Sequence, residues 1–154
     1  MAGFFGTYSA NVALATSTYE GALYAVVQSS LNRNVRHALF FAFFFLPPIW
    51  CALTLMLDWR RREAWGWWLL VAGVLYAFAV ILFTHQVNLP LNAYTESWDP
   101  ANLPSDWART RQQWNLANAW RSFASAVAFL AALISLALVR RHGDRPILID
   151  HSRS

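Results

Sequence analysis

Residues 38–57 read ALFFAFFFLPPIWCALTLML, 20 positions in which no side chain carries a charge. Two further uncharged runs, Ala64–Phe83 and Ser122–Val139, extend over 20 and 18 positions. An α-helix rises about 1.5 Å per residue, so each run is long enough to cross roughly 30 Å of hydrocarbon. Together the three runs predict a chain that crosses a membrane several times.

The composition points to the same class of protein. Hydrophobic residues make up 57% of the 154 residues, and charged residues make up 13%, about half the charged share of an ordinary soluble domain. The net charge of +4 comes from 12 Arg, with no Lys, against 8 acidic residues. In a membrane protein this excess indicates topology, and no nucleic-acid partner is expected. The single cysteine, Cys51, is expected to be a small buried hydrophobic side chain.

The first 32 residues hold a single charge, Glu20, and predict a further membrane helix. We therefore expect an all-α fold, an integral membrane four-helix bundle. The predicted helices lie at about 7–29, 37–57, 65–86 and 118–139, within a transmembrane domain over residues 1–142. A polar tail over residues 143–154 follows this domain. The loop over residues 87–117, between the third and fourth helices, is too long for a simple connection.

The distribution of arginine predicts the orientation. Four crossings place the N-terminus, the 58–64 loop and the C-terminal tail on one side of the membrane. That side holds seven Arg, and the other side holds four or five. Positively charged loops favour the cytoplasmic side. We expect a multi-pass protein of the plasma (inner) membrane with both termini, and the tail, in the cytoplasm.

A polar stripe marks one face of the first predicted helix. Thr16, Glu20, Tyr24 and Gln28 recur at every fourth position. A carboxylate within lipid is costly, so Glu20 is expected to face the bundle interior and to have a partner there. Two interpretations stay open: Glu20 fixes helix packing through an Arg or an amide, or it accepts a proton or contacts a substrate.

Polar groups also gather at the end of the third predicted helix, in the run Phe83–Asn92 (FTHQVNLPLN). Pro90 disfavours helical geometry at the residue before it, so the helix is expected to unwind there. Asn88 and Asn92 are then able to bond freed backbone groups or a ligand. Helical spacing places His85 on the same face as Asn88, and His85 is either a hydrogen-bonded anchor or a catalytic residue.

The start of the fourth predicted helix, Arg111–Arg121, reads RQQWNLANAWR. Trp114, Asn118 and Arg121 recur at i, i+4 and i+7, and Asn115 marks the adjoining face. Lipid does not satisfy polar groups, so this stripe is expected to point into the bundle. The Arg121 guanidinium offers five donors in a fixed fork, which suits a carboxylate or a developing oxyanion. The alternative is an Arg whose charged end reaches the lipid head groups.

The sequence predicts no metal site. Its four His and one Cys show no ligand spacing. It also contains no glycine-rich phosphate loop and no Ser–His–Asp arrangement.

Two of these motifs resemble the anthrone oxygenase family, a family of small four-helix membrane proteins. The motifs are Phe83-Thr-x-x-Val-Asn-x-Pro-Leu-Asn92 and, about twenty residues later, Arg111-x-x-Trp-Asn-x-x-Asn-x-x-Arg121. The stretch Glu20–Tyr24 is weakly similar as well. The resemblance covers most of the chain in its length and in the order of its helices.

The resemblance implies that the protein oxidises a polycyclic anthrone, or a similar quinol-like substrate, as a monooxygenase. Molecular oxygen is the co-substrate, and no dedicated cofactor is implied. A base removes a proton from the central carbon, the anion reacts with oxygen, and the peroxide loses water. In this hypothesis His85 or Glu20 is the catalytic base, and Arg121 stabilises the negative charge.

The same hypothesis assigns the residues that bind the substrate near the outer mouth of the bundle. They are Asn88, Asn92, Trp114, Asn115, Asn118 and Tyr24. The asparagines supply hydrogen-bond donors for the phenolate-like oxygen. Trp114 and Tyr24, with Trp120, line a slot in which a flat ligand stacks on aromatic rings.

Two other functions fit the sequence. A small proton-coupled multidrug-type transporter would use Glu20 to bind a proton and a substrate in turn, although such exporters have short loops and this chain has the long 87–117 loop. A non-catalytic accessory subunit would use the polar stripe to bind a larger membrane complex. The expected partners are the lipid bilayer, a hydrophobic aromatic small molecule, and a second copy of the chain or a larger membrane complex.

Overall fold

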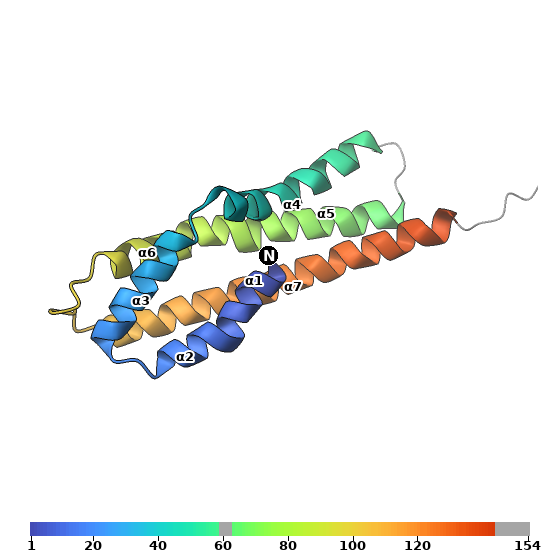
Figure 1. Ribbon diagram of the computed structural model, residues 1–154. Helices are drawn as coiled ribbons and strands as arrows, with labels where there is room; N and C mark the ends of the chain where they lie inside the picture. The colour runs from blue at the N-terminus through green and yellow to red at the C-terminus, as the bar shows by residue number, and fades with distance from the viewer. Residues whose placement is uncertain (59–62, 144–154) are drawn as a thin grey trace, which may run out of the picture.

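The computed structural model describes residues 1–58 and 63–143, with side chains as far as residue 140. This part of the chain is almost entirely helical and contains no strand (Figure 1). The all-α bundle expected from the sequence is therefore confirmed. The predicted polar tail lies outside the described residues, apart from its first position. Within the described part, three segments are long and apolar enough to cross a membrane: Ala38–Leu57, Ala64–Glu96 and Trp107–Arg140.

Two long antiparallel helical segments organise the bundle. The first consists of α5 (Ala64–Tyr76), the π-helices η2 (Ala77–Leu82) and η3 (Thr84–Asn88), and α6 (Leu89–Glu96). The second is α7 (Trp107–Gly143), which lies along the first (Figure 1). Their 33 and 37 residues give lengths of about 50 and 55 Å. Both exceed the roughly 30 Å of a bilayer's hydrocarbon.

The N-terminal region forms a helical hairpin, so the single helix expected over residues 7–29 is wrong. A first helix consists of α1 (Ala2–Thr7), the π-helix η1 (Tyr8–Val12) and α2 (Ala13–Ser17). The chain then turns, and α3 (Gly21–Asn34) returns toward the middle of the bundle (Figure 1). The first residue of the chain also lies near the middle of the bundle.

Hydroxyl side chains end this first helix. Ser17 Oγ donates a hydrogen bond to the Leu14 carbonyl at 2.6 Å, and Thr18 Oγ1 donates to the Ala15 carbonyl at 2.8 Å. Such bonds compete with the backbone bonds of a continuing helix. Glu20 then adopts an extended conformation, with φ −67° and ψ 158°, at the N-cap of α3. The polar stripe expected on one helix is thus divided between two.

Helix α4 (Ala38–Leu57) begins where α3 ends, after a break over residues 35–37. It packs on α5 and η2, whereas α3 packs on α6. The two helices therefore lie beside opposite ends of the same long segment. In Figure 1 the turn over residues 18–20 and the loop over residues 97–106 lie at one end of the bundle, and the end of α4 and the start of α5 lie at the other.

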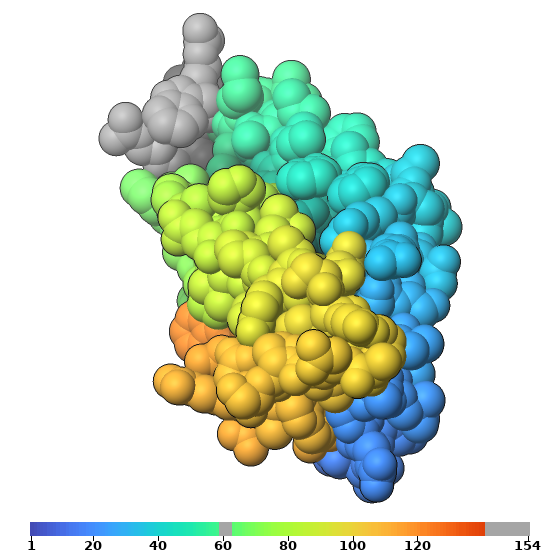
Figure 2. Space-filling view, turned by 90° about the vertical axis from the view of Figure 1, so that its left-hand side faces the viewer, coloured from blue at the N-terminus to red at the C-terminus, as the bar shows by residue number. Residues whose placement is uncertain are grey.

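The bundle consequently has two halves of different chemistry. The polar half comprises residues 8–34 and 84–121, and the apolar half comprises residues 38–57, 64–82 and 122–140. Figure 2 looks onto the end of the polar half, where the yellow residues of α6 and the following loop cover the space between the blue N-terminal helices and the orange start of α7.

Aromatic and small side chains fill the interior of the apolar half. Its core is a cluster of Phe44, Tyr76, Val80, Ala124 and Ala128, which Phe5 of α1 joins. Large apolar side chains, such as Phe43, Met56 and Leu133, are exposed on its outer surface. An exposed apolar surface of this extent is expected of a protein whose surroundings are lipid.

Pro90 does not unwind the third helix, in contrast to the sequence-based expectation. It lies in the first turn of α6, and the helical segment continues to Glu96. The preceding turn, η3, is π-helical. A wider π-turn relieves the clash between a proline ring and the carbonyl of the preceding turn, and it tolerates the missing N–H.

Candidate functional site

A buried cation lies at the boundary between the two halves. Arg121, on α7, is 7% exposed. Its Nη2 donates a hydrogen bond to Asn118 Oδ1 at 2.7 Å, and its Nε is buried without a partner. Within the described part of the chain, no carboxylate forms an ion pair with it. Burying an uncompensated charge is costly, so this arrangement indicates a place for a negatively charged ligand.

Aromatic rings flank the Arg121 guanidinium. Its central carbon lies 4.5 Å from the centroid of the Phe5 ring and 5.9 Å from that of Trp114. The Tyr8 ring lies 4.7 Å from the Trp114 ring. Cation–π contacts compensate part of the desolvation of the guanidinium. They also give the surroundings of Arg121 the flat, apolar walls that suit an aromatic ligand.

Asn118 fixes the position of Arg121 and ties the N-terminal helix to α7. Its Nδ2 donates to Ser9 Oγ at 2.8 Å and to the Phe5 carbonyl at 3.3 Å. Ser9 Oγ in turn lies 2.9 Å from Ser122 Oγ. Both ends of the Asn118 amide are therefore used within the protein, and its oxygen orients the guanidinium.

Asn88 is the counterpart of Arg121 on the opposite long segment. Its side chain is 0% exposed, and neither its amide oxygen nor its amide nitrogen has a partner. Two contacts show which residues of the antiparallel segments lie side by side. The Phe83 ring packs against the Trp120 ring, and Asn92 accepts a hydrogen bond from Trp114. Asn88 lies between these two contacts, opposite the turn of α7 that precedes Arg121.

Further buried polar atoms near this level also lack a partner. They are the Tyr76 hydroxyl, the Thr84 hydroxyl and Asn115 Oδ1. Buried polar groups in proteins are nearly always hydrogen-bonded to protein, water or ligand. Their concentration between α5, η3 and α7 indicates a polar binding site inside the bundle.

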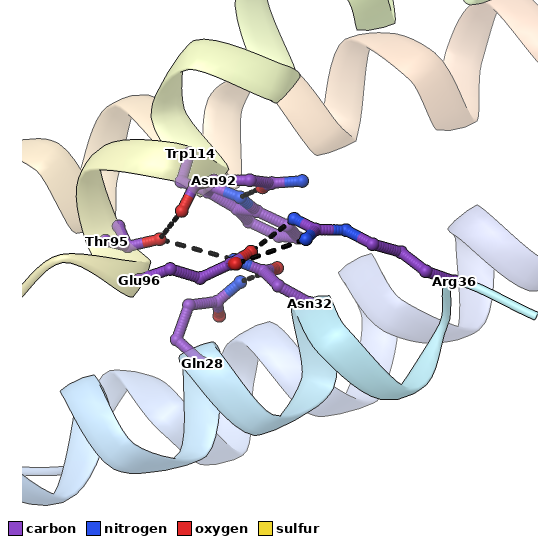
Figure 3. A network of polar contacts seen from close by, with 7 residues as sticks. All are labelled: Gln28, Asn32, Arg36, Asn92, Thr95, Glu96 and Trp114. Atoms are coloured by element: carbon purple, nitrogen blue, oxygen red, sulfur yellow. Dashed lines mark hydrogen bonds and ion pairs between the residues drawn. The ribbon is translucent and has the colours of Figure 1, made fainter.

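A hydrogen-bonded network closes the polar half above this site (Figure 3). The Trp114 indole donates to Asn92 Oδ1 at 2.6 Å. Thr95 Oγ1 donates to the Asn92 carbonyl at 3.1 Å and accepts from Asn32 Nδ2 at 3.3 Å. Asn32 Oδ1 accepts from Gln28 Nε2 at 2.9 Å. The network joins α3, α6 and α7.

The network returns to the aromatic wall through Tyr8, whose hydroxyl donates to Gln28 Oε1 at 2.7 Å. Arg36 and Glu96 form an ion pair at its edge. Because Tyr8 and Trp114 are each held by a side-chain hydrogen bond, the rings beside Arg121 have fixed orientations. The network therefore holds the aromatic walls of the site in place.

A second arginine holds the end of the polar half that lies farthest from the apolar half. Arg111 Nη1 donates to the Tyr19 carbonyl at 2.9 Å, at the turn that follows α2. Its guanidinium carbon lies 4.9 Å from the Trp107 ring and 5.5 Å from the Tyr24 ring. Tyr24 also packs against Trp98. Tyr24, expected in the substrate slot, therefore lies in this outer cluster beside Arg111.

The two expected catalytic bases lie elsewhere. Glu20 is exposed at the turn over residues 18–20, so the expectation that it faces the bundle interior is wrong. His85 is exposed as well, and it does not share a face with the buried Asn88. The π-helical turn explains the second difference, because its larger number of residues per turn separates positions i and i+3. Neither side chain contacts Arg121.

Other expected residues do come together. Asn118 bonds Arg121, Trp114 flanks it and bonds Asn92, and Asn88 with Asn115 carries unpartnered amide atoms at the same level. The arrangement offers a cation, amides and aromatic walls.

Four residues at or near the site were not anticipated from the sequence: Phe5, Tyr8, Ser9 and Tyr76. The first three follow a helical i, i+3, i+4 pattern, which was a usable signal. Tyr76 begins a series at every fourth position, with Val80, Thr84 and Asn88. The first helix was expected to begin at residue 7, and this placed Phe5 outside it.

The donor set favours an anion over a metal cation. In the described part of the chain, no three His, Cys, Asp or Glu side chains lie close enough to hold a metal. The groups around Arg121 are amides, hydroxyls and aromatic rings. A fixed positive charge among neutral donors suits an oxyanion.

A sequence model of the family described as anthrone oxygenase matches residues 34–131, which is well over half of the 154 residues. The chain belongs to the anthrone oxygenase family. The matched part contains α4 to α6 and most of α7, and therefore Asn88, Asn92 and Arg121, but it excludes the N-terminal hairpin. Searches of curated proteins and of solved structures found no match.

Proposed function

We propose that this anthrone oxygenase family member binds a hydrophobic polycyclic anthrone- or quinol-like substrate as its anion beside Arg121 and oxidises it with molecular oxygen. The observation that carries the proposal is the buried Arg121 guanidinium, which has aromatic rings on two sides and no carboxylate partner in the described residues. An enolate is a flat, aromatic anion, and it would supply both the missing charge and the stacking surface.

The proposed reaction converts one anthrone and one dioxygen into one anthraquinone and one water. Loss of a proton from the central CH₂ gives the enolate, whose negative charge lies mainly on the carbonyl oxygen. The enolate donates an electron to dioxygen, and the two radicals combine at the central carbon to give a peroxide. The peroxide anion takes up a proton to become a hydroperoxide. The remaining hydrogen on that carbon then leaves as a proton, the O–O bond breaks, and the new carbonyl forms as hydroxide departs. This second proton and the hydroxide yield the water.

Arg121 is the residue to which we assign stabilisation of the enolate. A preorganised cation in a water-poor site makes the C–H of the bound substrate more acidic. A weak base then suffices, and the exposed Glu20 and His85 are not required near the ring. The Asn88 Nδ2 supplies a further donor to an oxygen atom of the substrate, the Asn115 Oδ1 supplies an acceptor for a substrate hydroxyl, and Trp114 supplies a stacking face. This donor set supports chemistry that proceeds without a dedicated cofactor.

We propose that the apolar half lies in the plasma membrane and that the polar half extends beyond it on the outer side. The 20 residues of α4 match the roughly 30 Å of hydrocarbon. Arg60, Arg61 and Arg62 connect α4 to α5, and Arg140 ends the last apolar run. The positive-inside rule places this end in the cytoplasm. A substrate dissolved in the bilayer then reaches Arg121 from the membrane.

Transport receives less support from the structure. The transport hypothesis requires a carboxylate inside the membrane bundle, and Glu20 is instead exposed at the end of the polar half.

The proposal is tested by oxygen uptake with anthrone, using the full chain purified in mild detergent. The wild type is expected to consume one dioxygen per anthraquinone formed. Arg121→Leu is expected to lower kcat/KM by about 100-fold or more, as loss of an oxyanion donor does in other enzymes. Arg121→Lys, which keeps the charge, is expected to retain part of the activity.

Ser135→Ala is the matched control on the same helix, because its hydroxyl bonds the Trp65 carbonyl in the apolar half, away from Arg121. It is expected to turn over anthrone at the wild-type rate. An Arg121→Leu variant that is correctly folded and equally active would overturn the proposal.

A further inference from the structure

A small pocket lies in the apolar half, between the N-terminus, α4, α5 and α7, and has a volume of about 160 Å³. Pro47 and Pro48, midway along α4, form part of its wall, and alanines form much of the rest. Phe129 at its edge is 56% exposed, and the pocket is partly open to the surroundings of the apolar half. In the proposed placement these surroundings are the hydrocarbon of the membrane.

The pocket approaches Arg121 along one face of α7. Residues at i, i+4, i+7 and i+11 share a helix face, and from Arg121 these positions are Ser125, Ala128 and Ala132. All three line the pocket. Ser125 Oγ also donates a hydrogen bond to the Arg121 carbonyl. Ala128 belongs to the same core cluster as Phe5, whose ring lies against the Arg121 guanidinium. The pocket therefore begins one helical turn from Arg121.

The side chains of the pocket offer an occupant little to hydrogen-bond. Those with an OH or SH group are Cys51, Tyr76 and Ser125. The Ser125 hydroxyl is bonded to the Arg121 carbonyl, and the Tyr76 hydroxyl is buried, so that Tyr76 lines the pocket with ring carbons. A thiol is a weak donor. A polar occupant would lose its bonds to water without replacement, and the lining therefore favours an apolar one.

The volume narrows the choice further. An apolar cavity of roughly 150 Å³ binds benzene or xenon, so the pocket has no room for the fused rings of the proposed substrate. Dioxygen is smaller than both probes. It is also apolar, and it dissolves better in hydrocarbon than in water. Dioxygen is thus the reactant of the proposed chemistry that matches the volume, the lining and the depth of the pocket.

We propose that this pocket holds dioxygen taken up from the hydrocarbon and delivers it to the substrate anion beside Arg121. The inference rests on the proposed function and adds a route for its co-substrate. Tyr76 and Ser125 form the wall between the pocket and the site, since both line the pocket, Ser125 bonds the Arg121 carbonyl and Tyr76 interacts electrostatically with Arg121. Dioxygen passes this wall to reach the bound anion.

Two alanines of α7 allow a direct measurement on the unaltered full chain. Ala128 lines the pocket, whereas Ala131 is equally buried on the same helix, at 3% exposure against 5%, and does not line it. Dioxygen is paramagnetic and speeds the nuclear relaxation of nearby methyl groups. With ¹³C-labelled alanine methyl groups and the protein in lipid nanodiscs, dissolved dioxygen is expected to raise the relaxation rate of Ala128 severalfold more than that of Ala131.

Equal enhancement at Ala128 and Ala131 would overturn the dioxygen site. Nuclear Overhauser contacts between the Ala128 methyl group and lipid acyl protons would also overturn it, because they would identify an acyl chain as the occupant.

A variant tests whether the pocket supplies the reaction. Ala132→Leu adds bulk to a lining residue. It is expected to lower the enhancement at Ala128 and to raise the KM for dioxygen severalfold, with an unchanged KM for anthrone. Ala137→Leu is the matched control, since Ala137 is exposed on the same helix, and it is expected to behave as the wild type. An unchanged KM for dioxygen in an Ala132→Leu variant that has lost the enhancement would overturn delivery through the pocket.

The outcomes separate this inference from the proposed function. If dioxygen affected Ala128 and Ala131 equally while anthrone oxidation still depended on Arg121, the pocket would not be the route and the proposed function would stand. Conversely, enhancement at Ala128 without any oxygen uptake in the presence of anthrone would uphold dioxygen binding. It would contradict the oxygenase, and delivery with it.

Discussion

The interior of the apolar half and the boundary beside Arg121 differ in how their buried polar groups are bonded. In the apolar half the buried Ser135 hydroxyl donates to the Trp65 carbonyl at 2.9 Å, and the Trp65 indole donates to Glu63 at 3.1 Å. At the boundary with the polar half, the Arg121 Nε and both amide atoms of Asn88 are buried without partners. These groups of the apolar half are paired within the protein, whereas the boundary leaves groups that the proposed substrate would bond.

The position of this boundary has a physical reason. Within hydrocarbon, an unsatisfied polar group has no water to bond, so the cost of leaving it unpaired is largest there. Beyond the hydrocarbon, a network such as the one from Trp114 to Tyr8 can be built from many side chains. We expect a site at this junction to receive an apolar substrate from the hydrocarbon. Polar contacts in the polar half keep its side chains in position.

The largest expected difference between the halves concerns Arg121. Arg121→Met removes an uncompensated buried charge and keeps the volume apolar, so we expect it to raise stability, by about 1–4 kcal/mol if the gain matches that from replacing buried ion pairs by apolar residues. The same variant is expected to lose anthrone oxidation. Ser135→Ala removes a satisfied bond and is expected to cost about 1 kcal/mol. Thermal midpoints in detergent measure both changes, and a destabilised Arg121→Met would show that the guanidinium is structural.

The packing of the two halves can be compared at one glycine in each half. A Cβ on Gly21 would lie too close to Leu103 Cδ1 and 3.0 Å from the Trp107 ring, whereas a Cβ on Gly66 would meet Leu55 at 3.7 Å, an ordinary contact. Gly21→Ala is therefore expected to destabilise the protein by about 1–3 kcal/mol through overpacking.

Gly66→Ala is the matched control and is expected to be stabilising by about 0.5–1 kcal/mol, because alanine favours a helix. Thermal midpoints of the two variants give the comparison. Equal shifts would mean that the outer end of the bundle is no more tightly packed than α5.

The sequence predicts the apolar half better than the polar half. Long uncharged runs such as residues 38–57 have one solution in a membrane, a helix, and the predicted bounds of 37–57 agree with α4 to one residue. In the polar half, local side-chain hydrogen bonds determine where a helix ends. The hydroxyls of Ser17 and Thr18 break a run that hydrophobicity alone describes as one helix.

The candidate site shows the same limit. Arg121, Asn118 and Trp114 were found from spacing on an ordinary helix, and the structure brings these three together. His85 was placed with Asn88 by the same spacing, but the π-helical turn rotates it to the surface. A π-turn depends on packing against neighbouring helices, so the sequence pattern did not reveal it.

A smaller difference is expected between a tryptophan at the boundary and one in the apolar half. Trp114→Phe keeps an aromatic ring beside Arg121 and removes the 2.6 Å bond to Asn92. It is expected to cost about 1 kcal/mol of stability and to raise the KM for anthrone. Trp65→Phe removes the 3.1 Å bond to Glu63, with a similar cost and an unchanged KM. Oxygen-uptake kinetics on both variants check this, and a raised KM in Trp65→Phe would argue against confining the site to the boundary.

The smallest expected effect is at the edge of the polar half, in the Arg36–Glu96 ion pair. The Arg36 side chain is 43% exposed, and exposed pairs contribute about 0–1 kcal/mol. Glu96→Gln is therefore expected to lower the thermal midpoint by a degree or two, roughly the shift that a few tenths of a kcal/mol produces in a chain of this size. Raising the ionic strength should remove the difference, because salt screens exposed charges. If Glu96→Gln instead lowered anthrone oxidation strongly, the network in Figure 3 would extend the site to the protein surface, and the boundary would no longer separate a stabilising region from a reactive one.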